Sequence, residues 1–372
     1  MGGKLSTRFK HLLHRGAASF ERDWDDIRWW LAGGRGHHRR VHILAYAGYR
    51  NAETLRLKGR VVDPRAFRSP GRTAWSRFRA MLSIYNSHEL PGIEVRFEGH
   101  DASRDLVSDE EGYFEFELAL DRPLPARTTW EKARLAAPGR QAQDDGIEVP
   151  VLAPGTDNHW GVISDIDDTV METGATNFLK NWRRGLLHRP EDRLAVPGAA
   201  DLYRMIAHDH ERPVRPFFYV SSSPWNLYGF ITRYMELNGI PHGPMFLKDI
   251  GIDRNKFIKT GHGEHKLAAI ETILAFYPGF RFLLIGDSGQ HDIPIYAQAV
   301  EDFPARVGAV FIRDVGGTCA SGEKARLLAG IADRGIPTFC GEGFGDAIAV
   351  AEKLGLDRPL EAARAATLAE HS

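Results

Sequence analysis

Apolar and polar positions alternate along residues 41–153 in a way that predicts a β-rich region. Short segments rich in Val, Ile, Phe and Tyr recur between turn residues, at 41–47, 55–62, 93–97 and 113–118. Period-two alternation over four to eight residues is typical of strands. Several short strands at such intervals predict a small β-sandwich domain over 41–153, interrupted only by a helical spacing at 72–85.

Beyond a turn-rich linker at 154–158, the pattern changes to apolar strands that alternate with amphipathic helices. The strands are expected at 162–164, 217–220, 282–285 and 309–312. This order is the rhythm of a βαβ protein, so we predict an α/β domain over 159–360. Its fold would be an open parallel sheet with helices on both faces, and its site would lie at the carboxyl ends of the strands.

The first 40 residues form a basic leader with a possible amphipathic helix and the aromatic residues Trp29 and Trp30. Residues 1–80 contain 18 Lys and Arg against 6 Asp and Glu, a balance of +12, while the remainder has 30 against 43, a balance of −13. A basic leading segment on an acidic body suggests an anionic partner, and an anionic membrane surface is the one we expect. A solvated basic face without a partner is the alternative.

Composition sets the class of protein. Apolar residues make up 43% and charged residues 26% of the chain, as in an ordinary globular protein. No apolar run approaches the roughly 18 residues needed for a transmembrane segment. The two cysteines do not make a disulfide framework, which suits a reducing cytosol. We therefore expect a cytoplasmic protein that associates with membranes only peripherally.

Three carboxylates follow the first strand of the α/β region within four positions. They are Asp165, Asp167 and Asp168, and Thr169 comes directly after them. Clustered like charges at a strand end cost free energy unless a cation or a substrate compensates them. The cluster therefore indicates a chemical site, although Asp and Thr would also suit the first turn of a helix.

The second strand of this region ends in hydroxyls, at Ser221, Ser222 and Ser223, directly before a predicted helix. A hydroxyl and the backbone N–H groups at a helix start make a good phosphate cradle. A serine that only caps the helix is the alternative interpretation. Ser221, directly after the strand, is the first candidate for binding a phosphate.

A cation and a second acidic pair complete the candidates. Lys266 begins an amphipathic helix, where its ammonium could neutralise a phosphate and the carboxylates together, and Lys248 is its rival. The strand at 282–285 runs into Asp287, and Asp292 follows five positions later. Carboxylate oxygens suit Mg²⁺, so this pair predicts an acidic metal site, with a simple turn as the alternative.

Taken in order, these segments resemble the four motifs of the haloacid-dehalogenase-like (HAD-like) phosphohydrolases over about residues 155–345. A closer similarity, to the catalytic domain of the actin-patch phosphatidate phosphatases and their bacterial relatives, rests on Asp165-Ile-Asp-Asp-Thr-Val, Tyr219-Val-Ser-Ser-Ser-Pro-Trp-Asn, Ile285-Gly-Asp-Ser-Gly-Gln-His-Asp and Phe311-Ile-Arg-Asp314. The resemblance implies a HAD-like fold. It also implies Mg²⁺-dependent hydrolysis of phosphatidate to diacylglycerol and phosphate.

The resemblance assigns a role to each candidate. Asp165 would attack phosphorus and form an aspartyl-phosphate, while Asp167 would protonate the leaving oxygen and then activate water. Mg²⁺ would be held by Asp165, Asp167 and Asp287, with Asp292 orienting its waters. Binding of the substrate would fall to Thr169, Ser221, Ser222 and Lys266.

Two other classes of function stay open. One is a phosphatase for a nucleic-acid end or a phosphoprotein held by residues 1–80, although no nucleic-acid motif is present. The other is a non-enzymatic adaptor with a relic phosphatase fold, against which the retention of Asp165 and Asp167 argues. The insert at 171–215 mixes apolar and basic residues that could meet acyl chains and headgroups, or form a plain cap helix.

Overall fold

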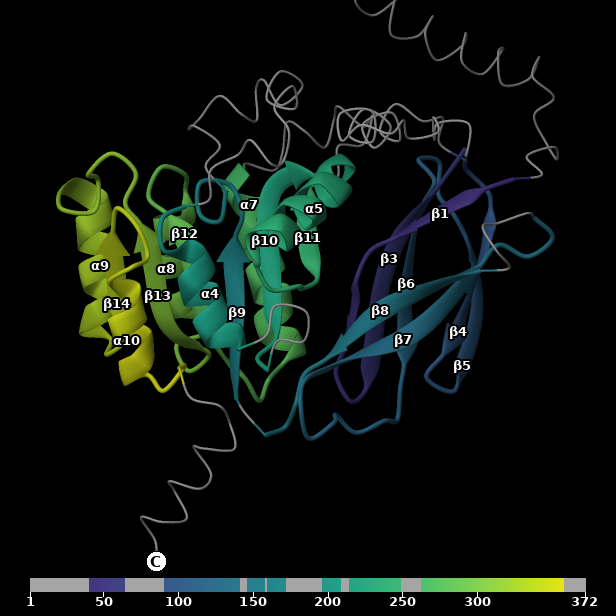
Figure 1. Ribbon diagram of the computed structural model, residues 1–372, viewed down its shortest axis with the longest axis horizontal. Coiled ribbons are helices and arrows are strands. Elements are labelled where there is room, and N and C mark those ends of the chain that lie inside the picture. Colours follow the sequence, from purple (N-terminus) through teal and green to yellow (C-terminus); the bar gives the residue numbers. More distant parts are fainter. Residues whose placement is uncertain are drawn as a thin grey trace, which may run out of the picture.

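The computed structural model of the 372-residue chain describes residues 40–63, 90–140, 146–157, 159–171, 196–208, 214–248 and 262–357. The basic leader up to residue 39, the helical spacing at 72–85 and most of the insert at 171–215 lie outside the described residues. The described part contains two sheets, which stand beside each other in Figure 1.

The first sheet has eight strands in the described residues. Their bounds are β1 His42–Ala45, β2 Gly48–Arg50, β3 Thr54–Val62, β4 Glu94–Gly99, β5 Ala102–Val107, β6 Tyr113–Ala119, β7 Thr129–Ala136 and β8 Ile147–Ala153. The hydrogen-bonded order is β1-β3-β2-β8-β7-β4-β5, and β6 pairs with β3. The alternation seen in the sequence reappears in β6, where buried and exposed side chains follow each other.

The predicted β-sandwich is realised as one curled sheet. The reason is β3, which pairs with β6 along one edge and shares its other edge between β2 and β1. The sheet closes around an apolar core that includes Leu57, Phe97, Phe116 and Val151. The four expected segments all contain strands, whereas β5, β7 and β8 were not expected. The connection of the strands into a single sheet depends on pairings that periodicity does not reveal.

The second sheet confirms the predicted parallel α/β arrangement. Its six strands are β9 Trp160–Asp165, β10 Phe217–Pro224, β11 Met245–Lys248, β12 Arg281–Asp287, β13 Val307–Arg313 and β14 Thr338–Gly341. They lie in the order β11-β10-β9-β12-β13-β14, and every neighbouring pair is parallel.

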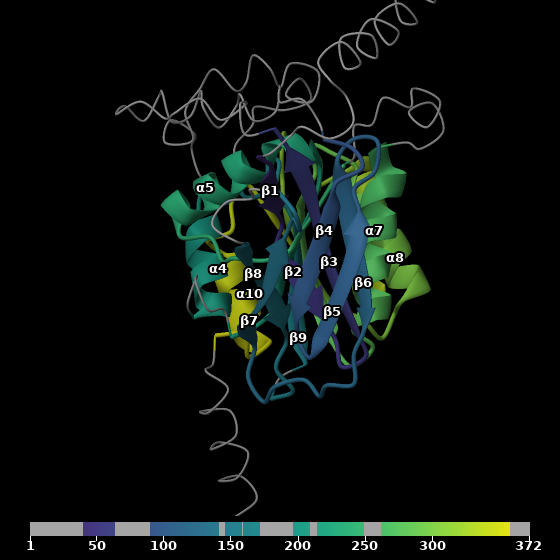
Figure 2. The ribbon, with the colours of Figure 1, turned by 90° about the vertical axis from the view of Figure 1, so that its right-hand side faces the viewer.

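Helices cover both faces of this sheet. They are α4 Ala199–Ala207, the short 3₁₀ turn η5 Trp225–Leu227, α5 Tyr228–Asn238, α7 His262–Phe276, α8 Asp292–Asp302, α9 Gly322–Asp333 and α10 Ala347–Lys353. Figure 2 shows α4, α5 and α10 on one side and α7 and α8 on the other. None of the helices in the described ranges is both long and apolar enough to cross a membrane.

Each face of the parallel sheet has its own apolar core. Successive residues of a strand point to opposite faces, so Val162 belongs to the core under α4 and α5 while Ile163 belongs to the core under α7 and α8. Phe217 and Phe218 divide in the same way. Burial on both faces explains why these strands read as continuous apolar runs in the sequence.

The strand order places a topological switch point at the carboxyl ends of β9 and β12. From β9 the chain moves to β10 and β11 on one side, and then returns to place β12 on the other side of β9. The connections after the two adjacent strands therefore leave in opposite directions. Open α/β sheets bind their ligands at such a switch point.

The two sheets are joined by direct contacts. The side chain of Asn51 donates a hydrogen bond to the Phe276 carbonyl (3.0 Å), and the Tyr277 hydroxyl donates one to the Arg50 carbonyl (3.2 Å). Tyr46 and Leu152, from the first sheet, are members of the apolar cores of the second. This boundary, the domain seam, is therefore a packed interface.

The two cysteines form a disulfide, which their number in the sequence did not predict. Cys319 follows β13 and Cys340 lies in β14, and these strands are parallel neighbours. Strand pairing thus brings together two residues that are 21 positions apart. Such a bond persists in oxidising surroundings, so this finding differs from the expectation of a reduced pair.

Candidate active site

The carboxylates that follow β9 lie in a tight turn. Asp168 has a φ of 59°, and its N–H donates to the Met171 carbonyl (2.9 Å). This left-handed conformation is uncommon for a residue other than glycine. The Thr169 hydroxyl donates to Asp165 Oδ2 (3.2 Å). Asp165 therefore ends β9 and Asp167 lies in the turn that follows it, so the alternative in which they occupy the first turn of a helix is not realised.

The structure gathers the predicted acids into one buried group. Asp165 and Asp167 are 2% and 4% exposed, and Asp287 and Asp292 are fully buried. Carboxylate oxygens of Asp165, Asp287 and Asp292 all lie within 4.8 Å of one another. Residues from β9, β12 and the start of α8 thus meet at the switch point of the sheet.

Lys266 supplies positive charge to this group. Its Nζ lies 2.7 Å from Asp165 Oδ1 and 2.7 Å from Asp292 Oδ1, and the side chain is buried. Lys248, the rival candidate, ends β11, where its backbone pairs with Pro224. The first turn of α7 therefore places Lys266 against the proposed nucleophile.

Two serine hydroxyls hold Asp167. Ser221 and Ser223 donate to its Oδ2 at 2.7 Å and 2.9 Å, and the Ser223 N–H donates to Ser221 Oγ (2.9 Å). Alternate residues of a strand share a face, so Ser221 and Ser223 point together and Ser222 does not join them. Sequence analysis proposed Ser221 and Ser222. The period of two was the signal that could have identified Ser223.

The loop after β12 is folded around Asp287. The backbone N–H groups of Gly289 and Gln290 donate to Asp287 Oδ1 (2.6 Å and 2.8 Å), and the Asp287 N–H donates to Asp292 Oδ2 (3.1 Å). A Cβ at Gly286 would lie 2.6 Å from Asp292 Oδ2. Only glycine therefore permits this close approach, and both Asp292 oxygens are already used by the protein, the other by Lys266.

Two further residues join the site that sequence analysis did not single out. The Gln290 side chain donates to the Asp167 carbonyl (2.8 Å) and accepts from Lys266 Nζ (3.1 Å). Arg313 donates to the Asp168 carbonyl (2.8 Å). Both residues lie within the segments that carry the family resemblance, so their position in the motifs was a signal.

Some buried carboxylate oxygens lack a hydrogen-bond partner among the described residues. They are Oδ1 of Asp167 and Oδ2 of Asp287, while Oδ1 of Asp165 has only its ion pair with Lys266. A buried acceptor without a partner costs about 1–3 kcal/mol, more when it is charged. Carboxylate oxygens are hard ligands, and those of Asp165 and Asp287 lie close to each other and to Asp292. The group therefore fits Mg²⁺.

Burial sets the electrostatics of the group. It raises the pKa of Asp165 well above the usual value, against the opposing charge of Lys266 and with support from Asp292 and Asp287. Burial also raises the pKa of Asp167, although hydrogen bonds from Ser221 and Ser223 oppose it. Both shifts favour the protonated form of a carboxyl, which is the form that a general acid needs.

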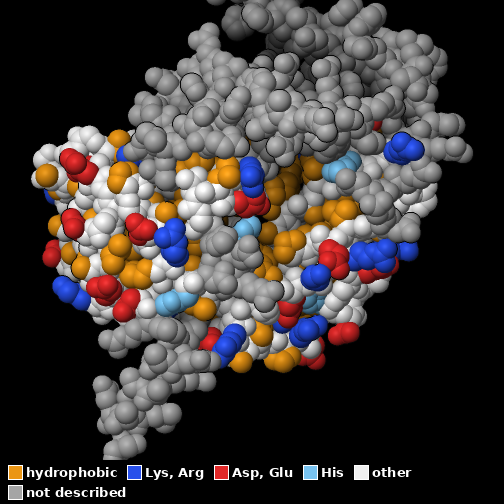
Figure 3. All heavy atoms as spheres, in the orientation of Figure 1, with side chains coloured by type: hydrophobic (Ala, Val, Ile, Leu, Met, Phe, Trp, Pro, Cys, Tyr) orange, Lys and Arg blue, Asp and Glu red, His pale blue; other side chains and the backbone are white. Residues whose placement is uncertain are grey.

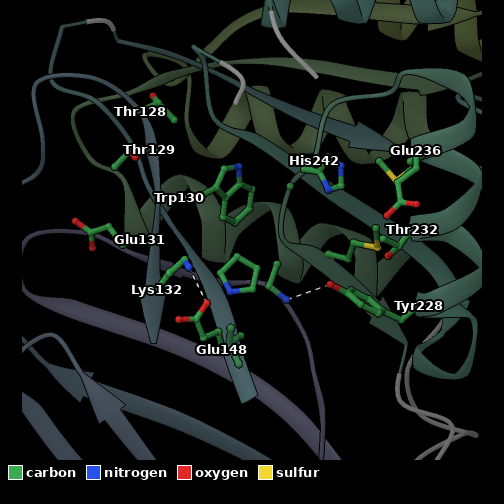
Figure 4. A pocket seen from close by; sticks show the side chains of 16 residues that line it. Thr128, Thr129, Trp130, Glu131, Lys132, Glu148, Tyr228, Thr232, Glu236 and His242 are labelled. Carbon is green, nitrogen blue, oxygen red and sulfur yellow. Dashed lines mark hydrogen bonds and ion pairs between the residues drawn. The ribbon is translucent and has the colours of Figure 1, made fainter. Parts of the chain in front are cut away.

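A cavity in the described part of the chain lies away from these carboxylates. It measures about 990 Å³ and is situated at the domain seam, between β7 and β8 on one side and α5 on the other. Figure 3 shows apolar side chains gathered between the two halves of this face. In Figure 4, Trp130 and Lys132 face Tyr228 and His242 across the cavity. None of the predicted catalytic residues lines this cavity, so it is separate from the group of carboxylates at the ends of β9 and β12.

Comparison with known proteins gives a family for the same segment. Residues 160–314 match the family model described as phosphatidate phosphatase APP1, catalytic domain. Phosphatidate phosphatase APP1 of Saccharomyces cerevisiae is 33% identical over 153 residues, which are 41% of this chain and 25% of that protein. An uncharacterised protein of Schizosaccharomyces pombe is 27% identical over 223 residues, 58% of this chain and 35% of that one.

These curated relatives are much longer than the matched region, and the chain spans about a quarter to a third of their length. A carbohydrate acetylesterase from Xanthomonas citri aligns in structure with 9% identity, covering 79% of this chain and 65% of that one. Its TM-score of 0.29 is too low to support an argument.

Proposed function

We propose that this chain is a Mg²⁺-dependent phosphatidate phosphatase with a HAD-like mechanism, because residues 160–314 match the model of the phosphatidate phosphatase APP1 catalytic domain. The substrate would be phosphatidate or a related lipid phosphate, and the products diacylglycerol and phosphate. The carrying observation is the buried group of carboxylates around Lys266, in which two acceptor oxygens have no hydrogen-bond partner within the described part of the chain. A protein maintains such a costly arrangement where it serves a reaction.

In the first step, Asp165 would act as the nucleophile. Its carboxylate forms a new bond to phosphorus while the bond from phosphorus to the alkyl oxygen breaks. The proton on Asp167 passes to that oxygen, which leaves as the alcohol. Both hydroxyl donors of the serine loop point at Asp167 Oδ2, so Oδ1 is the atom that would carry the proton.

In the second step, Asp167 would act as a base. Its carboxylate takes a proton from water as the water oxygen attacks the phosphorus of the aspartyl-phosphate. The bond between Asp165 and phosphorus breaks, phosphate leaves, and both residues return to their starting states. Lys266, at 2.7 Å from Asp165, would neutralise charge on the phosphoryl group in both steps.

Mg²⁺ would be held by Asp165 and Asp287, together with the backbone carbonyl of Asp167. The donor atoms support this assignment, because Asp287 Oδ2 has no other partner among the described residues and lies near Asp165. When bound, the cation would offset the repulsion of the carboxylates and polarise the phosphate. Asp292 would orient Lys266 and the Asp287 backbone instead of binding the metal directly.

The basic leader, which lies outside the described residues, would bring the enzyme to anionic bilayers. Each Lys or Arg near an anionic surface contributes on the order of 1 kcal/mol, and interfacial Trp adds apolar anchoring. We therefore propose a cytoplasmic enzyme that binds membranes peripherally. Co-sedimentation with anionic and neutral liposomes, with and without residues 1–39, tests this part on its own.

A phosphate-release assay on a substrate panel tests the main proposal. The panel contains phosphatidate, lysophosphatidate, 3′- and 5′-phosphorylated oligonucleotides and phosphopeptides, each with Mg²⁺ or with excess chelator. We expect the highest kcat/KM for phosphatidate and no turnover in chelator. Preference for an oligonucleotide or a phosphopeptide would support the alternative class of phosphatase, and inactivity towards all of them would support the adaptor.

A further inference from the structure

The serine loop that holds Asp167 continues directly into the domain seam. Ser221 and Ser223 both donate to Asp167 Oδ2, and only Pro224 separates Ser223 from Trp225. The orientation of the Asp167 carboxyl therefore depends on the backbone path from Ser221 to Trp225. Whatever fixes Trp225 also fixes the two hydroxyl donors.

Trp225 is held by residues of the first sheet. Its ring stacks on that of Tyr46 with centroids 4.3 Å apart and an interplanar angle of 24°, and both side chains are buried. The ammonium of Lys58 lies 5.1 Å from the centroid of the Trp225 ring. Aromatic pairs and cation–π contacts of this kind are attractive beyond the apolar area that they bury, so both hold the Trp225 ring in place.

Contacts on both sides of Trp225 extend this attachment. Arg60 donates to the Asn226 side chain (3.4 Å), and the Ala47 N–H donates to the Tyr228 hydroxyl (3.1 Å). The Tyr46 ring also lies 4.7 Å from that of Tyr228. Figure 1 shows β1 and β3 beside the end of the parallel sheet where α5 begins. The first sheet thus holds the start of α5 as well as the turn before it.

We propose that Tyr46 and Lys58 form a positioning clasp for Trp225, which sets the serine loop and through it the proton-donating carboxyl of Asp167. The inference rests on the proposed function and names the role of the first sheet in it. Tyr46 and Lys58 act through Trp225, Ser223 and Ser221, and are positioning residues. The clasp acts when Asp167 passes its proton to the departing alkyl oxygen.

A second aromatic group at the seam provides the matched control. Tyr49 packs against Phe276, Phe246 and Phe218 at centroid distances of 5.1, 5.5 and 6.1 Å. Phe218 and Phe276 belong to the core on the opposite face of the parallel sheet from that of Tyr46 and Trp225. Tyr49 therefore joins the sheets as Tyr46 does, but it does not pack on Trp225.

The leaving group of the substrate distinguishes positioning from simple stabilisation. An alkyl phosphate needs a proton on its poor leaving oxygen, whereas p-nitrophenolate departs without one. General acid catalysis contributes roughly 10²–10⁴-fold, and a small misplacement of the acid removes part of it. The ratio of kcat/KM for a short-chain phosphatidate to that for p-nitrophenyl phosphate therefore reports on Asp167, because kcat/KM covers the step in which the leaving group departs.

The experiment compares Tyr46→Ala, Tyr46→Phe, Lys58→Met and Tyr49→Ala in the full chain with Mg²⁺. We expect Tyr46→Ala to lower the ratio by roughly 10–100-fold, and Lys58→Met to lower it by a smaller factor. Tyr46→Phe keeps the stacked ring and should restore the wild-type ratio. Tyr49→Ala should leave the ratio of the two kcat/KM values unchanged, even if it lowers the stability of the protein.

Equal losses on both substrates in Tyr46→Ala, or the same change of ratio in Tyr49→Ala, would overturn the clasp and leave the phosphatase assignment intact. Circular dichroism and thermal unfolding show whether each variant folds. If Tyr46→Ala does not fold, Lys58→Met decides, since it removes the cation that lies above the Trp225 ring and also above the Tyr113 ring, and leaves both rings in place. A wild type inert towards every phosphomonoester would instead overturn the proposed function, and the clasp with it.

Discussion

Two buried charge clusters of this molecule differ in how completely their charges are paired. In the first sheet, Arg50 is 1% exposed and donates to both carboxylate oxygens of Glu131, at 2.7 Å and 2.8 Å. Its remaining contacts are with the carbonyls of Asn51, Arg122 and Pro123. A bidentate ion pair with further acceptors offsets the cost of desolvating both charges.

The cluster at the end of the second sheet is not balanced in this way. Four buried or nearly buried carboxylates meet there, and Lys266 contacts two of them. Oxygens of Asp167 and Asp287 lack hydrogen-bond partners among the described residues. The Arg50 cluster is therefore arranged to stabilise the folded state. The acid cluster is arranged to bind a cation or a substrate, which the chain alone does not supply.

The largest effect is expected when a catalytic carboxylate is replaced by an amide of nearly the same shape. We expect Asp165→Asn and Asp167→Asn each to lower kcat on phosphatidate by about 10⁴-fold, because an amide cannot act as nucleophile or proton donor. The free energy of unfolding should stay the same or rise, since a buried like charge is removed. Phosphate release and urea unfolding measure the two effects. Activity near that of the wild type in either variant would refute the mechanism.

The second test breaks the paired cluster. Arg50→Met should lower the free energy of unfolding by about 3–5 kcal/mol, because Glu131 would be left without its buried partner. Arg96→Met is the matched control, since Arg96 makes the same bidentate contact with Asp105 (2.8 Å for both bonds) on the exposed surface. The loss in Arg96→Met should be much smaller, because solvent screens an exposed ion pair. Equal losses in the two variants would show that burial does not distinguish the pairs.

The catalytic half was largely predictable from the sequence, because its chemistry lies at strand ends. Asp165, Asp287 and Ser221 each follow an apolar run, and parallel strands bring their carboxyl ends to one edge. The sequence also favoured Lys266, which the first turn of α7 places beside Asp165. The sequence analysis did not single out Ser223, whose hydroxyl donates to Asp167, although the period of two from Ser221 was a signal for it.

The first half was less predictable, because its decisive contacts are between residues far apart in the chain. Arg50 and Glu131 are 81 positions apart, and neither stands out in a motif. The triple pairing of β3 likewise has no local signal. Periodicity identifies a strand and its buried face, whereas partners and registers follow from the packing of the whole domain.

The third test adds Mg²⁺, the cation that we propose for the acid cluster. Mg²⁺ at about 100 times its Kd should raise the free energy of unfolding of the wild type by about 2.7 kcal/mol, because it binds the folded state. Asp287→Asn should remove most of this gain, while Asp201→Asn, an exposed change, should leave it intact. Thermal unfolding in Mg²⁺ and in chelator measures it. A gain that survives in Asp287→Asn would place the cation elsewhere.

The smallest expected effect is a pH dependence with opposite signs in the two clusters. Burial acts to raise the pKa of Glu131, but its contacts with Arg50 and His100 outweigh this and lower it to about 2. Between pH 4.5 and pH 2, Glu131 is therefore protonated in the unfolded chain but not in the folded protein. Stability from Glu131 is complete above the unfolded pKa near 4.5 and is lost as pH falls towards 2, by about 1 kcal/mol given partial solvation.

For Asp287 the sign is reversed in the absence of metal. Burial, with Asp292 beside it, raises its pKa from 3.8 to about 7. The folded protein keeps a proton that the unfolded chain releases, so stability from Asp287 is complete below pH 3.8 and is lost as pH rises through 7. Urea unfolding in chelator from pH 3 to pH 8 should show Glu131→Gln flattening the acid limb and Asp287→Asn the neutral limb. If both variants changed the same limb, the two clusters would not differ in the way their hydrogen bonds indicate.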